Sequence, residues 1–136
     1  MKTNGVLNRF QRGHQLPVSR KKALEYGYKL IEFPRPHIRI TLRQTSSGVS
    51  VLHGRRLVTK VYLNRSGMSA AAAIAEAMGL PLPKVGGHVT TLVSSGLLYR
   101  VLALSQLDFK NEAALEVAAR LVDEARDMHS GGRDDT

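Results

Sequence analysis

The chain has 136 residues, of which 43% are hydrophobic and 5% are aromatic, so its length suits one domain with a mainly aliphatic core. It contains no cysteine, which excludes disulfides, thiolate catalysis and cysteine-ligated zinc, and which fits a reducing cytoplasm. No apolar stretch of 18 residues and no signal-peptide pattern occurs, so we expect a cytoplasmic protein without a membrane-spanning segment.

The net charge of +9 is distributed unevenly along the chain. Residues 1–66 have a charge balance of +12, whereas residues 67–136 have a balance of −3. A small protein with such a split is expected to bind a polyanion through its basic part, and nucleic acid is the commonest polyanion. The alternative is a solvated basic surface. A membrane surface is disfavoured because no basic stretch has a large apolar face.

Residues 1–17 are predicted to be a flexible basic arm, because glycine and proline interrupt any periodicity there. Its cations would contact phosphates or enter a minor groove, although an ordinary disordered terminus explains the same composition. Residues 18–33 are predicted to form a helix. Its first turn contains Arg20, Lys21 and Lys22, where the helix dipole disfavours cations, which indicates either an anionic partner or simple solvation.

A strand is predicted over residues 37–43, where apolar and polar side chains alternate. The polar side of this strand would present Arg39 and Arg43. A turn and a returning strand that ends at His53 would complete a β-hairpin. Residues 18–53 are therefore expected to form a basic N-terminal extension of one helix and one hairpin.

Residues 54–64 are predicted to be the first helix of a core domain, because Leu57 and Val61 recur at helical spacing. The β-branched and aromatic residues of this stretch also favour a strand, which is the alternative. Arg55 and Arg56 at its start are candidate phosphate contacts.

The stretch 69–98 is the most informative part of the chain. It predicts a helix capped by Ser69 and ended by Gly79, then a tight turn, then a second helix over residues 83–95 that stops at Gly96. A short helix, a turn and a second helix make a helix-turn-helix unit, whose second helix can lie in the DNA major groove.

Small and apolar residues follow one order through this stretch: Ala75, Met78-Gly79-Leu80, Val85, His88-Val89, Leu92 and Gly96-Leu97-Leu98. That order resembles the winged helix-turn-helix transcription regulators of bacteria. The resemblance implies an α+β, mainly helical fold, with the winged helix-turn-helix domain over residues 54–110. It also implies binding of double-stranded DNA as a homodimer.

The predicted second helix departs from this family at Gly86 and Gly87, where polar or basic residues are usual. One interpretation is close approach of the backbone to DNA, with side-chain contacts from Lys84, His88 and two threonines. The other is a helix that no longer reads bases and serves packing or partner binding. The candidate DNA contacts are Lys84, Gly86, Gly87, His88, Thr90, Thr91, Arg20, Lys21, Lys22, Arg39, Arg43, Arg55 and Arg56.

A short wing is predicted from a strand over residues 97–104 and a return strand at 107–109. Residues 111–128 are then predicted to form a helix capped by Asp108 or Asn111, followed by a polar tail over residues 129–136. The apolar stripe of this helix suits packing on another helix, and the resemblance favours a dimer interface over packing on its own domain. The stripe consists of Leu115, Ala118, Leu121, Val122, Ala125 and Met128.

No catalytic or cofactor motif is recognised. The five histidines form no i, i+3 or i, i+4 pair, so no compact metal site is expected. No glycine pattern of a phosphate-binding loop occurs either. We therefore expect a protein that is not an enzyme and that binds neither a cofactor nor a metal.

Two functions follow from the sequence. The first is a sequence-specific double-stranded DNA-binding protein, a transcriptional regulator such as a repressor, acting as a homodimer. The second is an assembly module on a winged-helix scaffold that binds RNA, an acidic protein or a plasmid partition or replication partner without base reading by its second helix.

Overall fold

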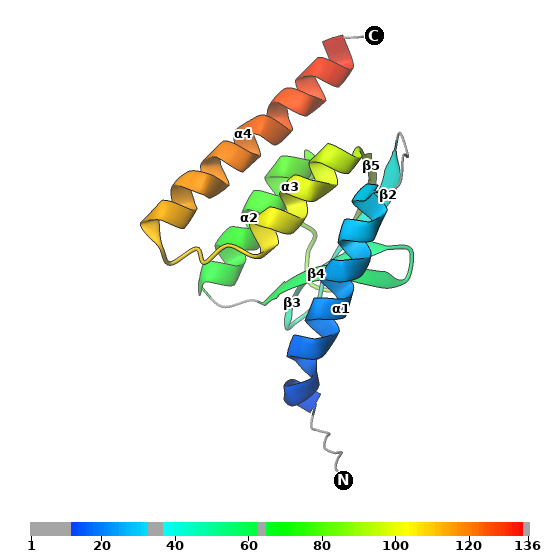
Figure 1. The fold of residues 1–136 in the computed structure, drawn as a ribbon, viewed down its shortest axis with the longest axis vertical. Coiled ribbons are helices and arrows are strands. Elements are labelled where there is room, and N and C mark those ends of the chain that lie inside the picture. Colours follow the sequence, from blue (N-terminus) through cyan, green and yellow to red (C-terminus); the bar gives the residue numbers. More distant parts are fainter. Residues whose placement is uncertain (1–11, 33–36, 63–64, 135–136) are drawn as a thin grey trace.

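The computed structural model describes residues 12–32, 37–62 and 65–134. These residues form an α+β fold with four helices and one four-stranded antiparallel sheet of strand order β4-β3-β2-β5 (Figure 1). The expected α+β class is confirmed, with about half of the chain helical. The elements are α1 (Arg12–Glu32), β2 (Ile38–Gln44), β3 (Gly48–His53), β4 (Arg56–Tyr62), α2 (Arg65–Met78), β5 (His88–Val93), α3 (Ser95–Ser105) and α4 (Glu112–Asp134).

Helix α1 confirms the helix predicted over residues 18–33 as far as Glu32. It begins at Arg12, so the predicted flexible arm is wrong for residues 12–17, while residues 1–11 lie outside the described part of the chain. The buried side of α1 includes Leu30. Gly27 allows close packing, because a Cβ atom there would lie 2.9 Å from Leu102 Cδ1 of α3.

Strands β2 and β3 form the hairpin that the sequence predicts. The inward residues of β2 are almost completely buried, whereas Arg39 and Arg43 are exposed. The turn closes with a hydrogen bond from Thr45 N to Gly48 O of 2.8 Å. Gly48 is required by a neighbouring strand, because a Cβ atom there would lie 2.3 Å from Val61 O.

The helix predicted over residues 54–64 is wrong, because residues 56–62 form strand β4. Gly54, with φ 63°, makes the tight turn from β3. The register shifts beside Val51 and Leu52, and this β-bulge buries both Val58 and Thr59. The β-branched residues of this segment pack against paired neighbours in β3. This packing stabilises a strand more than the approximate helical spacing of Leu57 and Val61 stabilises a helix.

Helix α2 confirms the first predicted helix but starts earlier, at Arg65, so Ser69 lies inside it and is not the cap. Its end is as predicted, because Gly79 takes a positive φ of 70°. Gly79 N donates to Glu76 O at 3.0 Å, and Leu80 N donates to Ala75 O at 2.9 Å. This pair of bonds is the Schellman motif, which satisfies the last carbonyls of the helix.

The predicted second helix over residues 83–95 is wrong, because His88–Val93 forms strand β5. The segment contains four β-branched residues that alternate in burial, and it pairs along its whole length with β2. Gly86 and Gly87 weaken any helix at its start. The helix pair of a helix-turn-helix is therefore not formed by residues 69–95.

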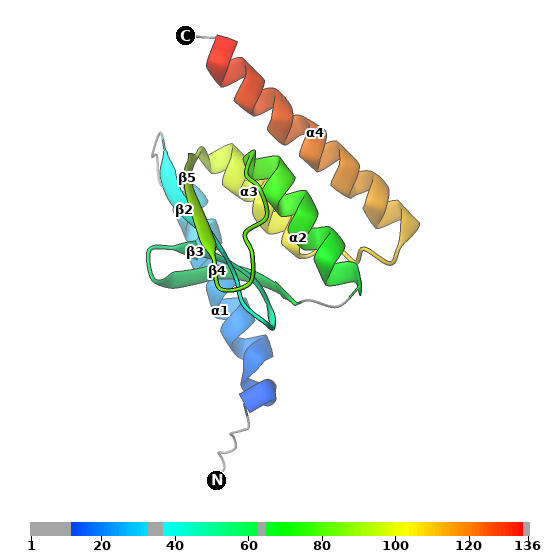
Figure 2. The same cartoon turned by 180° about the vertical axis from the view of Figure 1, so that it is seen from behind.

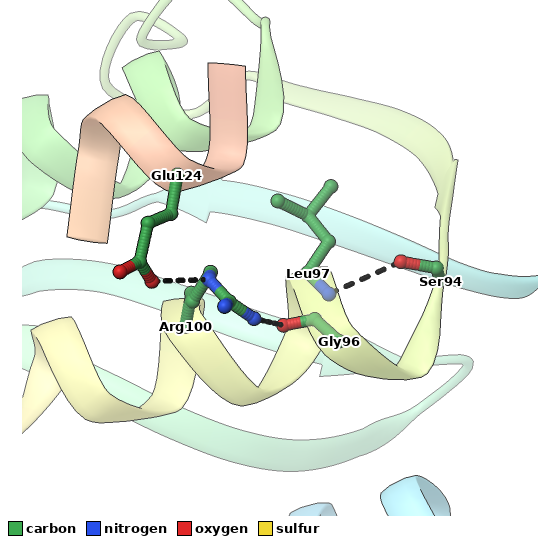
Figure 3. A network of polar contacts seen from close by, with 5 residues as sticks. All are labelled: Ser94, Gly96, Leu97, Arg100 and Glu124. Carbon is green, nitrogen blue, oxygen red and sulfur yellow. Dashed lines mark hydrogen bonds and ion pairs between the residues drawn. The ribbon is translucent and has the colours of Figure 1, made fainter. Parts of the chain in front are cut away.

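The strand predicted over residues 97–104 is also wrong, because the segment forms helix α3. Ser94 caps it by accepting a hydrogen bond from Leu97 N at 3.1 Å (Figure 3). Its apolar residues recur at helical spacing and are buried. Gly96 lies in the first turn of α3 and does not end a helix. A glycine suits this position because a Cβ atom there would lie 2.8 Å from Met128 Cε of α4. The predicted return strand at 107–109 is a turn.

Helix α4 is confirmed, with Asn111 Oδ1 accepting a hydrogen bond from Ala113 N at 2.8 Å. It continues to Asp134, so the predicted polar tail is helical over residues 129–134. Within the apolar stripe, Ala118, Leu121, Val122 and Ala125 are buried in the core of their own chain. The alternative of packing on its own domain is thus correct for these residues, and they are not available to a dimer partner.

The elements stack in layers (Figures 1 and 2). Helix α1 crosses one face of the sheet, and the view from behind shows the strands in front of α1. Helices α2 and α3 lie between the sheet and α4, which is the outermost element. None of the helices in the described residues is long and apolar enough to cross a membrane.

Candidate nucleic-acid interface

The face of the sheet that points away from α1 has exposed side chains on β2 and β5. Directly paired residues of antiparallel strands point to the same face, so the register defines which side chains share it. Arg39 and Arg43 of β2 are exposed, so the residues that pair with them on the neighbouring strands also face outward. We define the basic sheet face by eight of these outward residues: Arg39, Thr41 and Arg43 of β2, Ser50 of β3, Lys60 of β4, and His88, Thr90 and Leu92 of β5. The same register also places Leu52, Leu57 and Tyr62 on this side of β3 and β4, where Leu52 is buried.

One row of this face crosses all four strands. Arg43 pairs with His88 on one side and with Ser50 on the other, and Ser50 pairs in turn with Lys60. Because neighbouring strands lie about 4.8 Å apart, the backbones that carry Arg43 and Lys60 are separated by about 10 Å. Two cations therefore extend from the same row of the sheet.

The arginines of the basic sheet face have no protein partner among the described residues, in contrast to Arg100 and Arg56. Arg100 Nε donates to Glu124 Oε1 at 2.9 Å and ties α3 to α4 (Figure 3). Arg56 lies over the ring of Tyr26, with 3.9 Å from Cζ to the centroid. Among the described residues, neither Arg39 nor Arg43 forms an ion pair or a side-chain hydrogen bond. Their guanidinium groups remain available to an external anion.

Other polar groups of the face are held in place by neighbours. Lys60 Nζ lies 3.1 Å from Ser47 Oγ and 5.3 Å from the ring centroid of Tyr62. Thr41 Oγ1 and Thr90 Oγ1 are hydrogen-bonded across β2 and β5 at 2.7 Å. The first two contacts orient the lysine side chain. The threonine pair forms a short, ordered row between the rows that contain Arg39 and Arg43.

Negative charge is absent from the sheet and concentrated on α4. None of the four strands contains an aspartate or a glutamate. Helix α4 presents exposed or half-exposed acids on the side away from the core, beginning at Glu112. Since α2 and α3 separate α4 from the sheet, the molecule has a basic side and an acidic side. Such a distribution directs a polyanion to the sheet.

The structure brings together only part of the predicted set of DNA contacts. Arg39, Arg43, His88 and Thr90 lie on the basic sheet face. Thr91 does not, because it pairs with the buried Ile40 and shares its inward orientation.

The loop before β5 lies beside the same face. Its turn is fastened to the end of β2 by Gly86 N donating to Gln44 O at 2.7 Å and Gln44 N donating to Gly87 O at 3.1 Å. The loop places the exposed Lys84 next to the end of β2. Gly86 has a φ of 85°, and Gly87 N donates to Lys84 O at 2.7 Å. Both glycine N–H groups are used inside the protein, so the glycines serve the turn and do not supply donors to a phosphate.

The remaining predicted cations lie elsewhere. Lys21 and Lys22 are exposed on α1, across the sheet from the basic sheet face, and only the backbone of Arg20 is described. Arg56 turns toward α1 and Tyr26, whose hydroxyl lies 2.6 Å from His53 Nδ1. Its neighbour Arg55 is exposed in the turn between β3 and β4.

Three residues of the basic sheet face are not among the DNA contacts predicted from the sequence: Ser50, Lys60 and Leu92. The helices predicted over residues 54–64 and 83–95 contain Lys60 and Leu92, which in that form would not share a surface with Arg43. The signal that could have located Lys60 is the strand-forming composition of residues 57–62, with the lysine between inward-facing β-branched neighbours.

Comparisons of this chain with protein-family models, with curated proteins and with solved structures find no match. Within the described residues, no group of three or more His, Cys, Asp or Glu side chains could hold a metal ion.

Proposed function

We propose that this protein binds double-stranded DNA through its basic sheet face. The observation that carries the proposal is the pair of arginines without protein partners, Arg39 and Arg43, on an open sheet whose strands contain no carboxylate. Phosphate neutralisation by arginine and lysine supplies most of the affinity of such proteins. Antiparallel strands are one of the known elements that enter DNA grooves. In this proposal, strands β2 and β5 contact the DNA in place of the second helix that the sequence predicts over residues 83–95.

Double-stranded nucleic acid fits this surface better than single-stranded RNA. Single strands are held mainly by stacking of bases on aromatic rings. Strands β2, β3 and β5 contain no Phe, Tyr or Trp, and Tyr62 on β4 lies beside Lys60. The exposed side chains of β2 and β5 on this face are two guanidinium groups, a histidine, a threonine and Leu92, which suit phosphates and base edges.

We assign the role of a transcriptional regulator that acts as a homodimer. One sheet face covers a short stretch of duplex, and two-fold pairing would double the number of phosphates contacted. The dimer surface must lie outside the buried part of the α4 stripe, because those side chains fill the core of their own chain.

The test compares the double variant Arg39→Gln/Arg43→Gln with the matched control Lys110→Gln/Arg120→Gln. Both variants remove two exposed positive charges, but the control charges lie at and before α4. Binding to duplex DNA of random sequence is measured by fluorescence anisotropy between about 50 and 200 mM salt. On duplex of random sequence, where most positions offer the two arginines no matching guanine, we expect both to contact phosphates. The double variant should therefore lose about tenfold in affinity and reduce the log–log salt slope by up to about 2, because each phosphate contact contributes about 0.9.

An equal loss of affinity in both variants would show that only net charge matters and would overturn the sheet face as the binding surface. Tighter binding of single-stranded RNA than of duplex DNA would instead support the assembly module.

A further inference from the structure

Strands β2 and β5 form a two-stranded ribbon at one edge of the sheet, and the sheet order places no strand beyond β5 in the described chain. Their outward side chains fall into three directly paired rows. The rows are Arg43 with His88, Thr41 with Thr90, and Arg39 with Leu92. The middle row is short and internally hydrogen-bonded, so the arginines on either side extend beyond it.

The size of this ribbon matches the DNA major groove. The groove is about 12 Å wide and admits a two-stranded β-ribbon. Two strands about 4.8 Å apart fill that width once their side chains are included. The remaining strands then lie over one wall of the groove, where Lys60 meets the phosphates. Lys84 is exposed in the loop that is fastened to the end of β2.

The chemistry of the outer rows matches base edges. Arginine recognises guanine through its O6 and N7 atoms, and an apolar side chain contacts the methyl group of thymine. Leu92 is 51% exposed although its neighbour Val93 is buried, so the core does not account for it. It lies directly opposite Arg39. An apolar side chain beside a free guanidinium provides two different base contacts in one row.

We propose that the β2–β5 ribbon reads the major groove, with Arg39 and Arg43 each recognising a guanine and Leu92 a thymine methyl group. Arg39 and Arg43 are four residues apart on one strand, which is about 14 Å. The two guanines therefore lie about four base pairs apart, since base pairs rise by about 3.4 Å. The thymine lies beside the guanine that Arg39 contacts. This inference rests on the proposed function.

The first test is selection of bound duplexes from a random library with the full-length protein. We expect enrichment of two guanines at the stated separation with a thymine next to one of them. Arg39→Ala and Arg43→Ala should each relax preference at one guanine by roughly tenfold. Lys60→Ala is the matched control on the same face, and it should weaken binding to all sequences without changing the preference.

The second test isolates Leu92 by replacing the thymine with deoxyuridine, which lacks only the methyl group. Wild-type protein should bind the uracil duplex several-fold more weakly, whereas Leu92→Ala should bind both duplexes equally. Leu92 is exposed on the sheet, so circular dichroism should show an unchanged fold in the variant.

The two levels of the proposal fail differently. If every variant weakens binding uniformly and no base is enriched, the ribbon contacts phosphates only, and the base-reading inference is overturned while DNA binding stands. If the protein does not bind duplex DNA, or if variants of the basic sheet face bind it as wild type does, the proposed function fails as well.

Discussion

Single residues of this protein separate into those that shape the backbone and those whose side chains face solvent. Gly48 belongs to the first group, because the oxygen of Val61 occupies the place of its missing side chain. Gly86 is required only for its positive φ, since a Cβ atom there would meet nothing within 4 Å. Arg39 and Arg43 belong to the second group, because their side chains form no ion pair or hydrogen bond among the described residues.

The two glycines should differ in their effect on stability. Gly48→Ala must displace the backbone of β4 and is expected to cost about 2–4 kcal/mol of unfolding free energy. Gly86→Ala bears only the left-handed strain of about 1–2 kcal/mol. Chemical denaturation with circular dichroism measures both. Equal losses in the two variants would show that β3 and β4 do not approach as closely as described.

Helix α4 is joined to the body of the protein by its apolar stripe. Leu121 is 9% exposed and lies in the core with α2 and α3, whereas Leu115 is 44% exposed at the start of the stripe. The Arg100–Glu124 ion pair adds a partly exposed link between α3 and α4, and such pairs contribute at most about 1 kcal/mol. Packing therefore holds α4 more firmly than charge does.

Leu121→Glu should unfold the protein or detach α4, because burial of an unpaired carboxylate costs several kcal/mol. Leu115→Glu adds the same charge at a half-exposed position and is expected to change stability by less than about 1 kcal/mol. Thermal unfolding followed by circular dichroism distinguishes them. A folded Leu121→Glu variant whose only change is a smaller mass in light scattering would restore the stripe as a dimer interface.

The whole molecule combines a basic sheet face with an acidic outer helix. Helices α2 and α3 lie between them, and packed helix axes are about 8–10 Å apart, so α4 is roughly two layers from a bound duplex. That distance exceeds the Debye length of about 8 Å at physiological salt but not that of about 30 Å at 10 mM.

Neutralising the acids of α4 should consequently change DNA association only at low salt. Glu112→Gln/Glu116→Gln is expected to raise the association rate a few-fold at about 10 mM salt and to leave it unchanged at about 150 mM. Stopped-flow fluorescence measures the rate. An effect that persists at the higher salt would place α4 in contact with the DNA.

Local patterns in the sequence determined the helices α1, α2 and α4 and the hairpin of β2 and β3. Each is indicated by a feature within one segment. These features are the alternation of apolar and polar residues in 37–43, the glycine that takes a positive φ at position 79, and the apolar stripe along residues 111–128. Arg39 and Arg43 were therefore assignable to one exposed face before the fold was known.

Tertiary pairing decided β4, β5 and α3, for which the local pattern was ambiguous. A strand is stabilised by partners that are distant in sequence, and β5 pairs with residues about fifty positions earlier. Once β5 lies on β2, the following apolar run is left to cover the sheet as a helix. The basic sheet face exists only in that register, because pairing between strands places His88, Thr90 and Lys60 on the face that carries Arg43. These residues are distant from one another along the chain.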